Sequence, residues 1–281
     1  MKNVLKFYKY QGAGNDFLIA DNRDGTIALT PQQIAALCDR RYGVGADGLM
    51  LLEASADYDF RMVYYNSDGS GGMMCGNGGR CIVAFAADMG LESFRFEAAD
   101  GEHLAEVISD ENGLKVVALR MIDVSGLQHY DVLSGVSVPS DGYYVYTGTR
   151  HYVRLVDGLG EYDVRGEGRD IRYNASELQP EGVNVNFVEP YEGGIKVRTY
   201  EKGVEDETYA CGTGIVASCL AAYEAGIPPG EVTEQGRVSY GVMALRDALV
   251  VDFLPVGENA AKDVWLTGPA TFVAEINVPI L

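Results

Sequence analysis

The chain has 281 residues, enough for one large domain or two domains of ordinary size. Its 47% of hydrophobic residues and 35 glycines are typical of a turn-rich globular protein and exclude a disordered one. The 41 acidic against 22 basic residues give a net charge of −19, which excludes nucleic acid and anionic membranes as partners, since phosphates bind clustered Lys and Arg. A small zwitterionic molecule is compatible with this charge.

The predicted elements of the first half begin with two strands, 4–10 and 16–21, joined by a glycine-rich turn. Thr30 and Pro31 then predict a helix that runs to about residue 40, because threonine caps helices and proline fits their first turn. Strands at 49–53 and 59–65, a helix at 77–89 ended by glycine 90, and a strand at 113–119 follow.

The second half repeats this order. Strands are predicted at 143–147, 151–156, 183–189 and 194–200, a helix at 213–225 ended by glycine 226, and strands at 249–253 and 270–278. The two glycine-terminated helices are apolar almost all round at 81–87 and 215–222. A helix without a polar stripe belongs inside a protein.

An internal duplication explains the repeated order. The shift of the sequence that places Cys75 on Cys211, here called the duplication offset, also superposes Gly90 on Gly226 and Gly12 on Gly148. An unchanged register over this distance indicates two copies of one domain-sized unit. We therefore expect a curved sheet wrapped around one buried helix, made twice, with the two units facing each other.

No segment suggests export or membrane insertion. The first residues lack the apolar run of a signal peptide, and no stretch approaches the roughly 18 apolar residues that cross a bilayer. We expect a cytoplasmic protein with reduced thiols. The odd number of cysteines and the lack of a CxxC pair predict neither a disulfide framework nor a zinc ribbon. No metal site is expected, because His103, His129 and His151 lack ligand spacing with the cysteines.

Two of the five cysteines, Cys75 and Cys211, stand just before the buried helices, each followed by Gly-x-Gly. The backbone N–H groups and dipole of a helix N-terminus favour a bound carboxylate, and they also favour thiolate over thiol. With one such sulfur on each face of a substrate Cα, a thiolate removes the proton and the opposite thiol supplies another. The pair therefore predicts inversion of an amino-acid centre without a cofactor.

The other thiols have an ordinary explanation. Cys38, Cys81 and Cys219 are interpreted as small buried hydrophobic residues. A cysteine hydrolase that pairs Cys75 with His151 is an alternative, but it leaves Cys211 without a task. A non-catalytic amino-acid-binding protein is a further alternative, and it would tolerate replacement of both thiols.

These motifs resemble those of the diaminopimelate epimerase family. The resemblance covers most of the chain and rests on residues 12–17 (GAGNDF), 43–48 (GVGADG), 66–70 (NSDGS) leading to 74–81 (MCGNGGRC), and 200–203 (YEKG) leading to 210–214 (ACGTG). Proline racemase-like enzymes also use two cysteines but differ in the first motif, and PhzF-like isomerases share the expected fold without requiring facing cysteines.

The resemblance implies an α+β fold of two pseudo-symmetric domains, each a curved, mostly antiparallel β-sheet or barrel around a central buried helix. It places the domains at 1–125, joined by a final strand 269–281, and at 126–268. It also implies interconversion of L,L- and meso-diaminopimelate in lysine and peptidoglycan precursor synthesis, with no cofactor. Whether two copies form a homodimer is left open.

By motif match, the resemblance makes Cys75 and Cys211 the acid/base pair. His151 would support the thiols. The residues implied to bind the substrate are Asn15, Asn66, Gly76, Asn77, Asn184, Glu201, Lys202, Gly212 and Thr213. Amides and one carboxylate suit an amino-acid end, which needs donors for its carboxylate and an acceptor for its ammonium.

The chain departs from the family pattern at three places that would serve the distal end of the substrate. Lys202 stands where many members have Arg, Gly48 where some have Gln, and Thr149-Arg150 where Asn-Pro or Ser-Pro is usual. Lys and Arg are not interchangeable at a bidentate carboxylate site, and we hypothesise that Arg150 supplies the missing guanidinium. A racemase or epimerase of another amino acid (histidine, lanthionine or hydroxyproline) with the same two thiols therefore stays the alternative.

Overall fold

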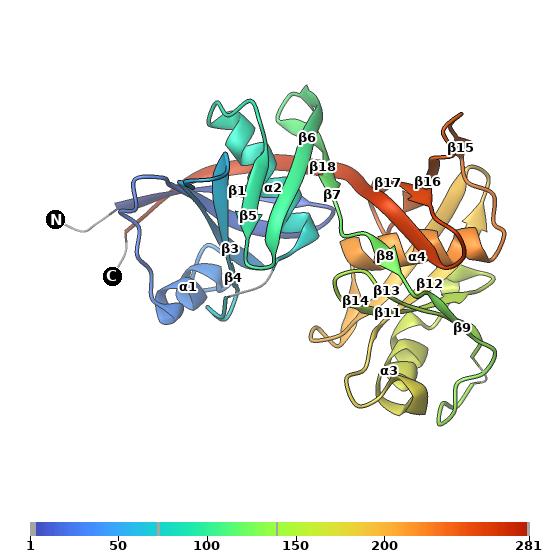
Figure 1. Cartoon of the computed structure of the whole chain (residues 1–281). Coiled ribbons are helices and arrows are strands. Elements are labelled where there is room, and N and C mark those ends of the chain that lie inside the picture. The colour runs from blue at the N-terminus through green and yellow to red at the C-terminus, as the bar shows by residue number, and fades with distance from the viewer. Residues whose placement is uncertain (1–3, 72–73, 139, 280–281) are drawn as a thin grey trace. The chain divides into compact units, whose positions relative to one another are not determined.

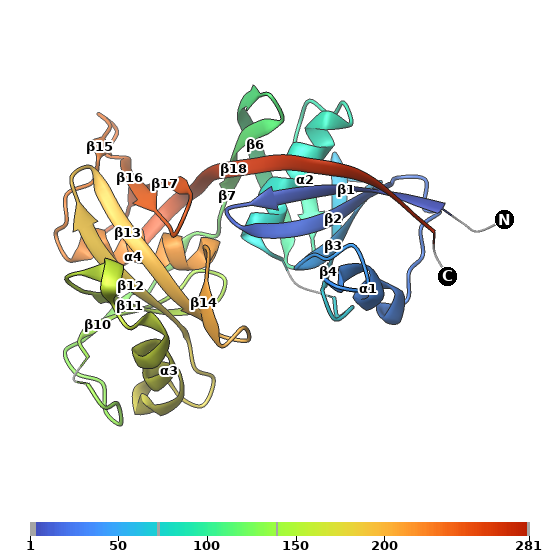
Figure 2. The same ribbon diagram turned by 180° about the vertical axis from the view of Figure 1, so that it is seen from behind.

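The computed structural model describes residues 4–71, 74–138 and 140–279. The chain forms two compact units: unit 1 is Met1–Leu119 with Gly268–Leu281, and unit 2 is Arg120–Thr267. Figures 1 and 2 show the elements of each unit from two sides. In the described part of the chain, none of the helices has the length and apolar character needed to span a bilayer.

The strands of unit 1 form a closed barrel. Each strand pairs with the next along the chain, and β18 pairs with both β7 and β1, which closes the ring. The members are β1 (Val4–Gly12), β2 (Asn15–Asn22), β3 (Gly48–Glu53), β4 (Phe60–Asn66), β5 (Arg95–Ala98), β6 (Gly101–Glu111), β7 (Leu114–Arg120) and the second half of β18 (Ala260–Pro279). Among the pairs that these described strands form, β2–β3 and β4–β5 are the parallel ones.

The two helices of unit 1 supply the crossovers that these parallel pairs need. Helix α1 (Pro31–Cys38) joins β2 to β3, and its capping box between Thr30 and Gln33 confirms the predicted start. Helix α2 (Gly76–Asp88) joins β4 to β5, and its residues 77–86 are all buried. Tyr8 and Tyr10 of β1 pack on Phe85 with ring centroids 5.0 and 5.9 Å apart. The predicted buried helix is confirmed.

Unit 2 repeats the pattern around α4 (Gly212–Glu224), whose residues 214–222 are buried. Its sheet runs from β9 through β10, β11, β12, β13, β16 and β17 to the first half of β18, which also pairs with β8. The strands are β8 (Val124–Ser125), β9 (Gln128–Tyr130), β10 (Gly142–Tyr146), β11 (Arg150–Leu155), β12 (Asn184–Tyr191), β13 (Gly194–Glu201), β14 (Asp206–Thr208), β15 (Glu231–Val232), β16 (Val238–Met243) and β17 (Ala248–Pro255). The pairs β11–β12 and β13–β16 are parallel.

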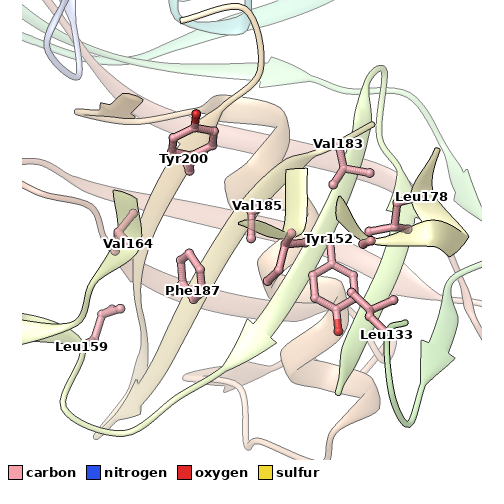
Figure 3. Close-up of a cluster of buried hydrophobic side chains, with 11 residues drawn as sticks. Leu133, Tyr152, Leu159, Val164, Leu178, Val183, Val185, Phe187 and Tyr200 are labelled. Carbon is pink, nitrogen blue, oxygen red and sulfur yellow. The ribbon is translucent and has the colours of Figure 1, made fainter. Parts of the chain in front are cut away.

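A second core of unit 2 lies between its sheet and α3 (Val164–Asn174), a helix that the sequence pattern did not predict (Figure 3). Val164, Gly168 and Ile171 are its buried positions, at helical spacing. Gly168 leaves room for Tyr200, because a Cβ there would lie 2.4 Å from the Tyr200 Cβ. Its glycines lower helix propensity and conceal the pattern.

The duplication offset is visible in the fold. It carries α2 onto α4 residue for residue, and it carries α1 into the second half of α3. Cys75 and Cys211 are the N-cap residues of α2 and α4, both with extended backbone. Gly90 and Gly226 follow the two helices with φ of 85° and 75°, the left-handed conformation that ends helices.

Candidate active site

Cys75 is half-buried at the start of α2, and its carbonyl accepts the first helical hydrogen bond from Gly79 N at 2.7 Å. The next residue, Gly76, opens the helix, and Gly78 faces the Cys75 side chain, since a Cβ at Gly78 would lie 3.5 Å from the Cys75 Cβ. The first-turn N–H groups of α2 thus stand beside this sulfur, at the end of the helix that favours an anion.

A chain of amides runs from α2 to the β1–β2 turn. Asn77 Nδ2 donates to Asn15 Oδ1 at 2.6 Å, and Asn15 Nδ2 donates to Asp47 Oδ2 at 2.9 Å. Ala13 and Gly14, with φ of 50° and 90°, form the two-residue turn that presents Asn15. The structure thus brings Asn15 and Asn77 together and bonds them to each other, and their contact with a substrate stays a prediction.

Arg80 is a buried cation in the first turns of α2 that sequence reasoning did not single out. Its side chain is fully buried, and Nη2 donates to Asn77 Oδ1 at 2.8 Å. The residue lies inside the MCGNGGRC motif, which was the available signal. A buried guanidinium at this helix N-terminus adds positive charge to that of the helix dipole.

Asn66 ends β4, where Nδ2 donates to Ser70 Oγ at 2.9 Å and Oδ1 accepts from the Tyr64 hydroxyl at 3.2 Å. The same tyrosine explains the departure at Gly48. A Cβ at Gly48 would lie 2.7 Å from Tyr64 Cε2, so the ring occupies the space that a side chain would need. The Tyr65 carbonyl oxygen would lie equally close, at 2.7 Å, so the ring and the backbone together require glycine here.

In unit 2, Cys211 is 9% exposed at the start of α4. Its Sγ lies 3.5 Å from Thr213 Oγ1, which in turn lies 2.9 Å from Nε2 of His151 on β11. Thr149 Oγ1 lies 2.8 Å from the same nitrogen. The predicted residues Cys211, Thr213 and His151 therefore form one connected group.

His151 is neutral in this environment. Complete burial lowers its pKa to about 3. Its Nδ1 lies 3.1 Å from Nδ2 of Asn186, a buried residue of β12 that sequence reasoning missed. A second asparagine at alternate spacing in the same strand was the signal, because both Asn184 and Asn186 interrupt an otherwise apolar run.

Asn184 lies beside this group with its amide bonded within unit 2. Its Nδ2 donates to Thr149 Oγ1 at 3.1 Å and to the Arg150 carbonyl at 3.3 Å, and its Oδ1 accepts from the Lys202 N–H at 2.8 Å. That it touches a substrate stays a prediction. Glu201, half-buried, ends β13 next to Lys202.

Two cations meet at Glu181. Arg150 Nη1 lies 3.0 Å from Glu181 Oε2, and Lys202 Nζ donates to the Glu181 carbonyl at 2.7 Å. The Arg150 and Glu181 side chains are 37% and 53% exposed. Two of the three departures from the family pattern, those at Arg150 and Lys202, therefore contact the same residue.

The duplication offset also relates the contacts of the two groups. Asn15 corresponds to His151 and Asn77 to Thr213, and each pair is hydrogen-bonded in its own unit. Gly78 corresponds to Gly214, which closes on Asn186 because a Cβ there would lie 2.3 Å from Asn186 Oδ1. The corresponding positions are therefore in contact in both units, through two amides in unit 1 and through an imidazole and a hydroxyl in unit 2.

The remaining thiols are buried. Burial raises the pKa of Cys38 to about 11, and it raises the pKa of Cys81 and of Cys219 well above the ordinary value. These three are the small buried residues that the sequence suggested. Among the described residues, no group of three or more His, Cys, Asp and Glu is arranged to hold a metal ion.

Comparison with known proteins identifies the relatives. A family model described as diaminopimelate epimerase matches residues 7–121 and 143–239. A diaminopimelate epimerase of Chlorobaculum tepidum is 42% identical over 269 residues, which cover 93% of this chain and 96% of the relative. Another, of Aquifex aeolicus, is 38% identical over 288 residues and covers 96% of each chain.

Solved structures share the fold at low sequence identity. A PhzF-family phenazine biosynthesis protein of Bacillus anthracis has a TM-score of 0.71 at 16% identity, with 98% of this chain and 99% of that chain covered. A hydroxyproline epimerase of Agrobacterium vitis has a TM-score of 0.67 at 15% identity, with 99% and 94% covered. Their likeness shows the fold alone. Together with the family model and the full-length relatives, it follows that this chain belongs to the diaminopimelate epimerase family.

Proposed function

We propose that the chain is an isomerase that interconverts L,L- and meso-diaminopimelate, a step of lysine and peptidoglycan precursor synthesis. The match to curated diaminopimelate epimerases over nearly the whole chain carries this conclusion. The cytoplasm, where thiols stay reduced, is the compartment that its chemistry requires.

Cys75 and Cys211 are proposed as the acid/base pair. One sulfur, as thiolate, takes the α-proton while the other, as thiol, gives its proton to the opposite face of the same carbon. After the reaction the sulfur that was a thiolate is a thiol, and the sulfur that was a thiol is a thiolate. Support comes from the two matched helix N-caps, where dipole and N–H groups favour thiolate. The proposal requires both units, as two epimerase domains, to bind one substrate.

The reacting carboxylate is proposed to bind the first turns of the two helices, at Gly76, Asn77, Gly212 and Thr213. The N–H groups and the dipole of a helix start favour a bound carboxylate. In water the α-proton is a very weak acid, so these donors must also stabilise the negative charge that develops on the carboxylate as the proton leaves. Asn15, Asn66, Asn184 and Glu201 are proposed to contact the same end of the substrate.

The distal carboxylate is proposed to bind the cations at Glu181. Arg150 and Lys202 already share that residue, and a substrate carboxylate can replace the Glu181 carboxylate on Arg150. Arg150→Ala should raise KM at least about tenfold, the effect of losing one charged hydrogen bond. Arg165, which is 73% exposed and 3.4 Å from Asp206, provides the matched control, and Arg165→Ala should leave KM unchanged. An unchanged KM in Arg150→Ala would assign the distal group to other residues.

Deuterium incorporation at Cα tests the function. The enzyme is incubated in D₂O with diaminopimelate and, separately, with histidine, lanthionine and hydroxyproline. Exchange is expected with diaminopimelate alone and is expected to be lost in Cys75→Ala and in Cys211→Ala. Exchange with one of the other amino acids alone would overturn the substrate assignment, whereas inversion of Cα that survives either substitution would overturn the two-thiol mechanism.

A further inference from the structure

The hydrogen bonds behind Cys211 have a direction, which is set at Asn186. The Asn186 side-chain nitrogen lies 3.1 Å from the carbonyl oxygen of Tyr152, a group that only accepts. That contact fixes which end of the amide is nitrogen. The Asn186 oxygen faces Thr199 Oγ1 at 2.9 Å on the other side. The same nitrogen lies 3.1 Å from His151 Nδ1, so it donates there as well.

The proton of the imidazole is located by this contact. A neutral imidazole carries one proton, and a ring nitrogen that accepts a hydrogen bond does not carry it. Because Nδ1 accepts from Asn186, the proton lies on Nε2. The ring is fully buried among uncharged groups, which keeps it neutral. His151 is thus held as the Nε2–H tautomer.

The tautomer decides where the Thr213 hydroxyl points. Nε2–H lies between Thr149 Oγ1 at 2.8 Å and Thr213 Oγ1 at 2.9 Å, and neither hydroxyl can donate to a nitrogen that bears a proton. Two other partners of Thr213 Oγ1 are Thr149 Oγ1 at 3.3 Å and Cys211 Sγ at 3.5 Å. The two lone pairs of Thr149 Oγ1 accept from Asn184 Nδ2 and from Nε2–H, so this oxygen has none left for the Thr213 proton. The sulfur is left as the acceptor for the Thr213 proton.

We propose that Asn186 is a positioning residue of the Cys211 half: it fixes His151 as the Nε2–H tautomer, and His151 thereby turns the Thr213 hydroxyl onto the Cys211 sulfur. A donated hydrogen bond stabilises the thiolate relative to the thiol. His151, with Nε2 protonated, acts as a donor and does not take the thiol proton. The proposal rests on the proposed function, because it concerns the readiness of one of the two proposed acid/base groups.

The hydrogen-bonded chain from Asn186 to Cys211 has no counterpart at the corresponding position of unit 1. Under the duplication offset Asn186 corresponds to Met50, which is buried and has a thioether in place of an amide. The charged side chains at the ends of the neighbouring strands are Arg150, paired with Glu181, and Glu201 and Lys202 at the end of β13. The chain from Asn186 to Cys211 itself contains uncharged groups up to the sulfur.

The test measures the tautomer and the thiol separately. The two nitrogen resonances of His151 are recorded by ¹⁵N NMR, which is practical because the chain has only 3 histidines. The alkylation rate of Cys211 by iodoacetamide is followed by mass spectrometry in a Cys75→Ala background. Both are compared for the parent, Asn186→Asp, Asn186→Ala and the control Thr199→Val, which removes a buried hydrogen bond from the same amide without touching His151.

The parent and Thr199→Val should show the Nε2–H tautomer. Asn186→Asp should convert His151 to Nδ1–H, because a carboxylate accepts where the amide donated. Alkylation of Cys211 should then slow about ten- to hundredfold, and kcat in the Cys75-containing enzyme should fall by a similar factor with little change in KM. Asn186→Ala adds no charge and should also slow both the alkylation of Cys211 and turnover. It replaces Asn186→Asp in the test if the Asp variant does not fold.

An Nδ1–H tautomer in the parent would overturn the proposal. So would an unchanged Cys211 alkylation rate in folded Asn186→Asp or Asn186→Ala, or an equal loss in Thr199→Val. The tautomer and alkylation measurements need no substrate. A failure of diaminopimelate exchange in the parent therefore contradicts the proposed function without affecting this result.

Discussion

Alanine substitution of two matched glycines gives a direct measure of how differently the duplicated helices are packed. Gly78 in α2 and Gly214 in α4 occupy the same position of their helices. A Cβ at Gly78 would lie 3.2 Å from the Sδ of Met50, the movable part of a flexible side chain. A Cβ at Gly214 would lie 2.3 Å from Asn186 Oδ1 and 3.2 Å from His151 Cε1.

The two substitutions should change the free energy of unfolding differently. Each substitution gains roughly 1 kcal/mol of helix propensity. At Gly78 only a methionine must move, so we expect Gly78→Ala to be neutral or stabilising by up to about 1 kcal/mol. At Gly214 the Asn186 amide must leave its place, and loss of one or two buried hydrogen bonds at roughly 1–3 kcal/mol each outweighs the gain. Gly214→Ala should therefore destabilise by about 2–4 kcal/mol.

Urea unfolding followed by circular dichroism measures the stability of both variants, and deuterium exchange into diaminopimelate measures their activity. Gly214→Ala should also lower kcat at least about tenfold, because the displaced amide no longer orients His151. Gly78→Ala should keep near-normal stability. Equal losses of stability in the two variants, or a greater loss in Gly78→Ala, would refute the packing argument.

Three other predictions follow from the local environments. The pKa of His151 in the folded protein, about 3, lies below its ordinary value of 6.5, so the unfolded state binds more protons between these values and stability should fall as the pH drops through 6.5. Urea midpoints measured at pH 7.5, 5.5 and 4.5 should therefore fall more steeply for the parent than for His151→Gln. Parallel curves for the two proteins would contradict this prediction. Thr30→Ala removes the capping box of α1 and should cost about 1 kcal/mol of unfolding free energy without changing the exchange rate, so a loss of activity would be unexpected. Cys38, Cys81 and Cys219 should resist iodoacetamide in the native protein and react only after denaturation, as mass spectrometry of digested protein would show; early labelling of any of them would contradict their burial.

The sequence predicted those elements whose signals are local and strong. The helices after Cys75 and Cys211 were found from an apolar stretch bounded by glycine, and both end within a residue of the prediction. The β1–β2 hairpin was found because Gly12 and Gly14 mark its turn between alternating strands. Family motifs then identified the neighbours of each cysteine.

Other elements carry weaker signals. Strands β5, β14 and β15 went unpredicted because they are short, and β6 because it is largely exposed and rich in charge. Strand β16 went unpredicted although buried and half-buried residues alternate along it. Helix α3 was missed because glycines at 166 and 168 lower its propensity. The duplication itself contained the missing signal, since the offset places the well-capped α1 on α3.

For the candidate site, the sequence indicated which residues belong to it better than it indicated which residues they contact. It suggested Asn184 as a substrate contact, which stays a prediction, and the structure adds that the Asn184 amide is bonded to Thr149, Arg150 and Lys202. It passed over Asn186 and Arg80, whose importance lies in burial and in contacts across strands that no local pattern records. The need for glycine at 48 became clear only when Tyr64 was found in the adjacent space.

The central claim is that two sulfurs act on one carbon from opposite faces. Its most direct measurement is the position of deuterium in the first turnovers of L,L-diaminopimelate in D₂O, read by NMR or mass spectrometry of the separated isomers. The account predicts that newly formed meso product carries one deuterium at the inverted centre while the recovered L,L substrate stays unlabelled. Early label in the recovered substrate, or product that retains the substrate's own proton, would show that a single base serves both faces and would contradict the account.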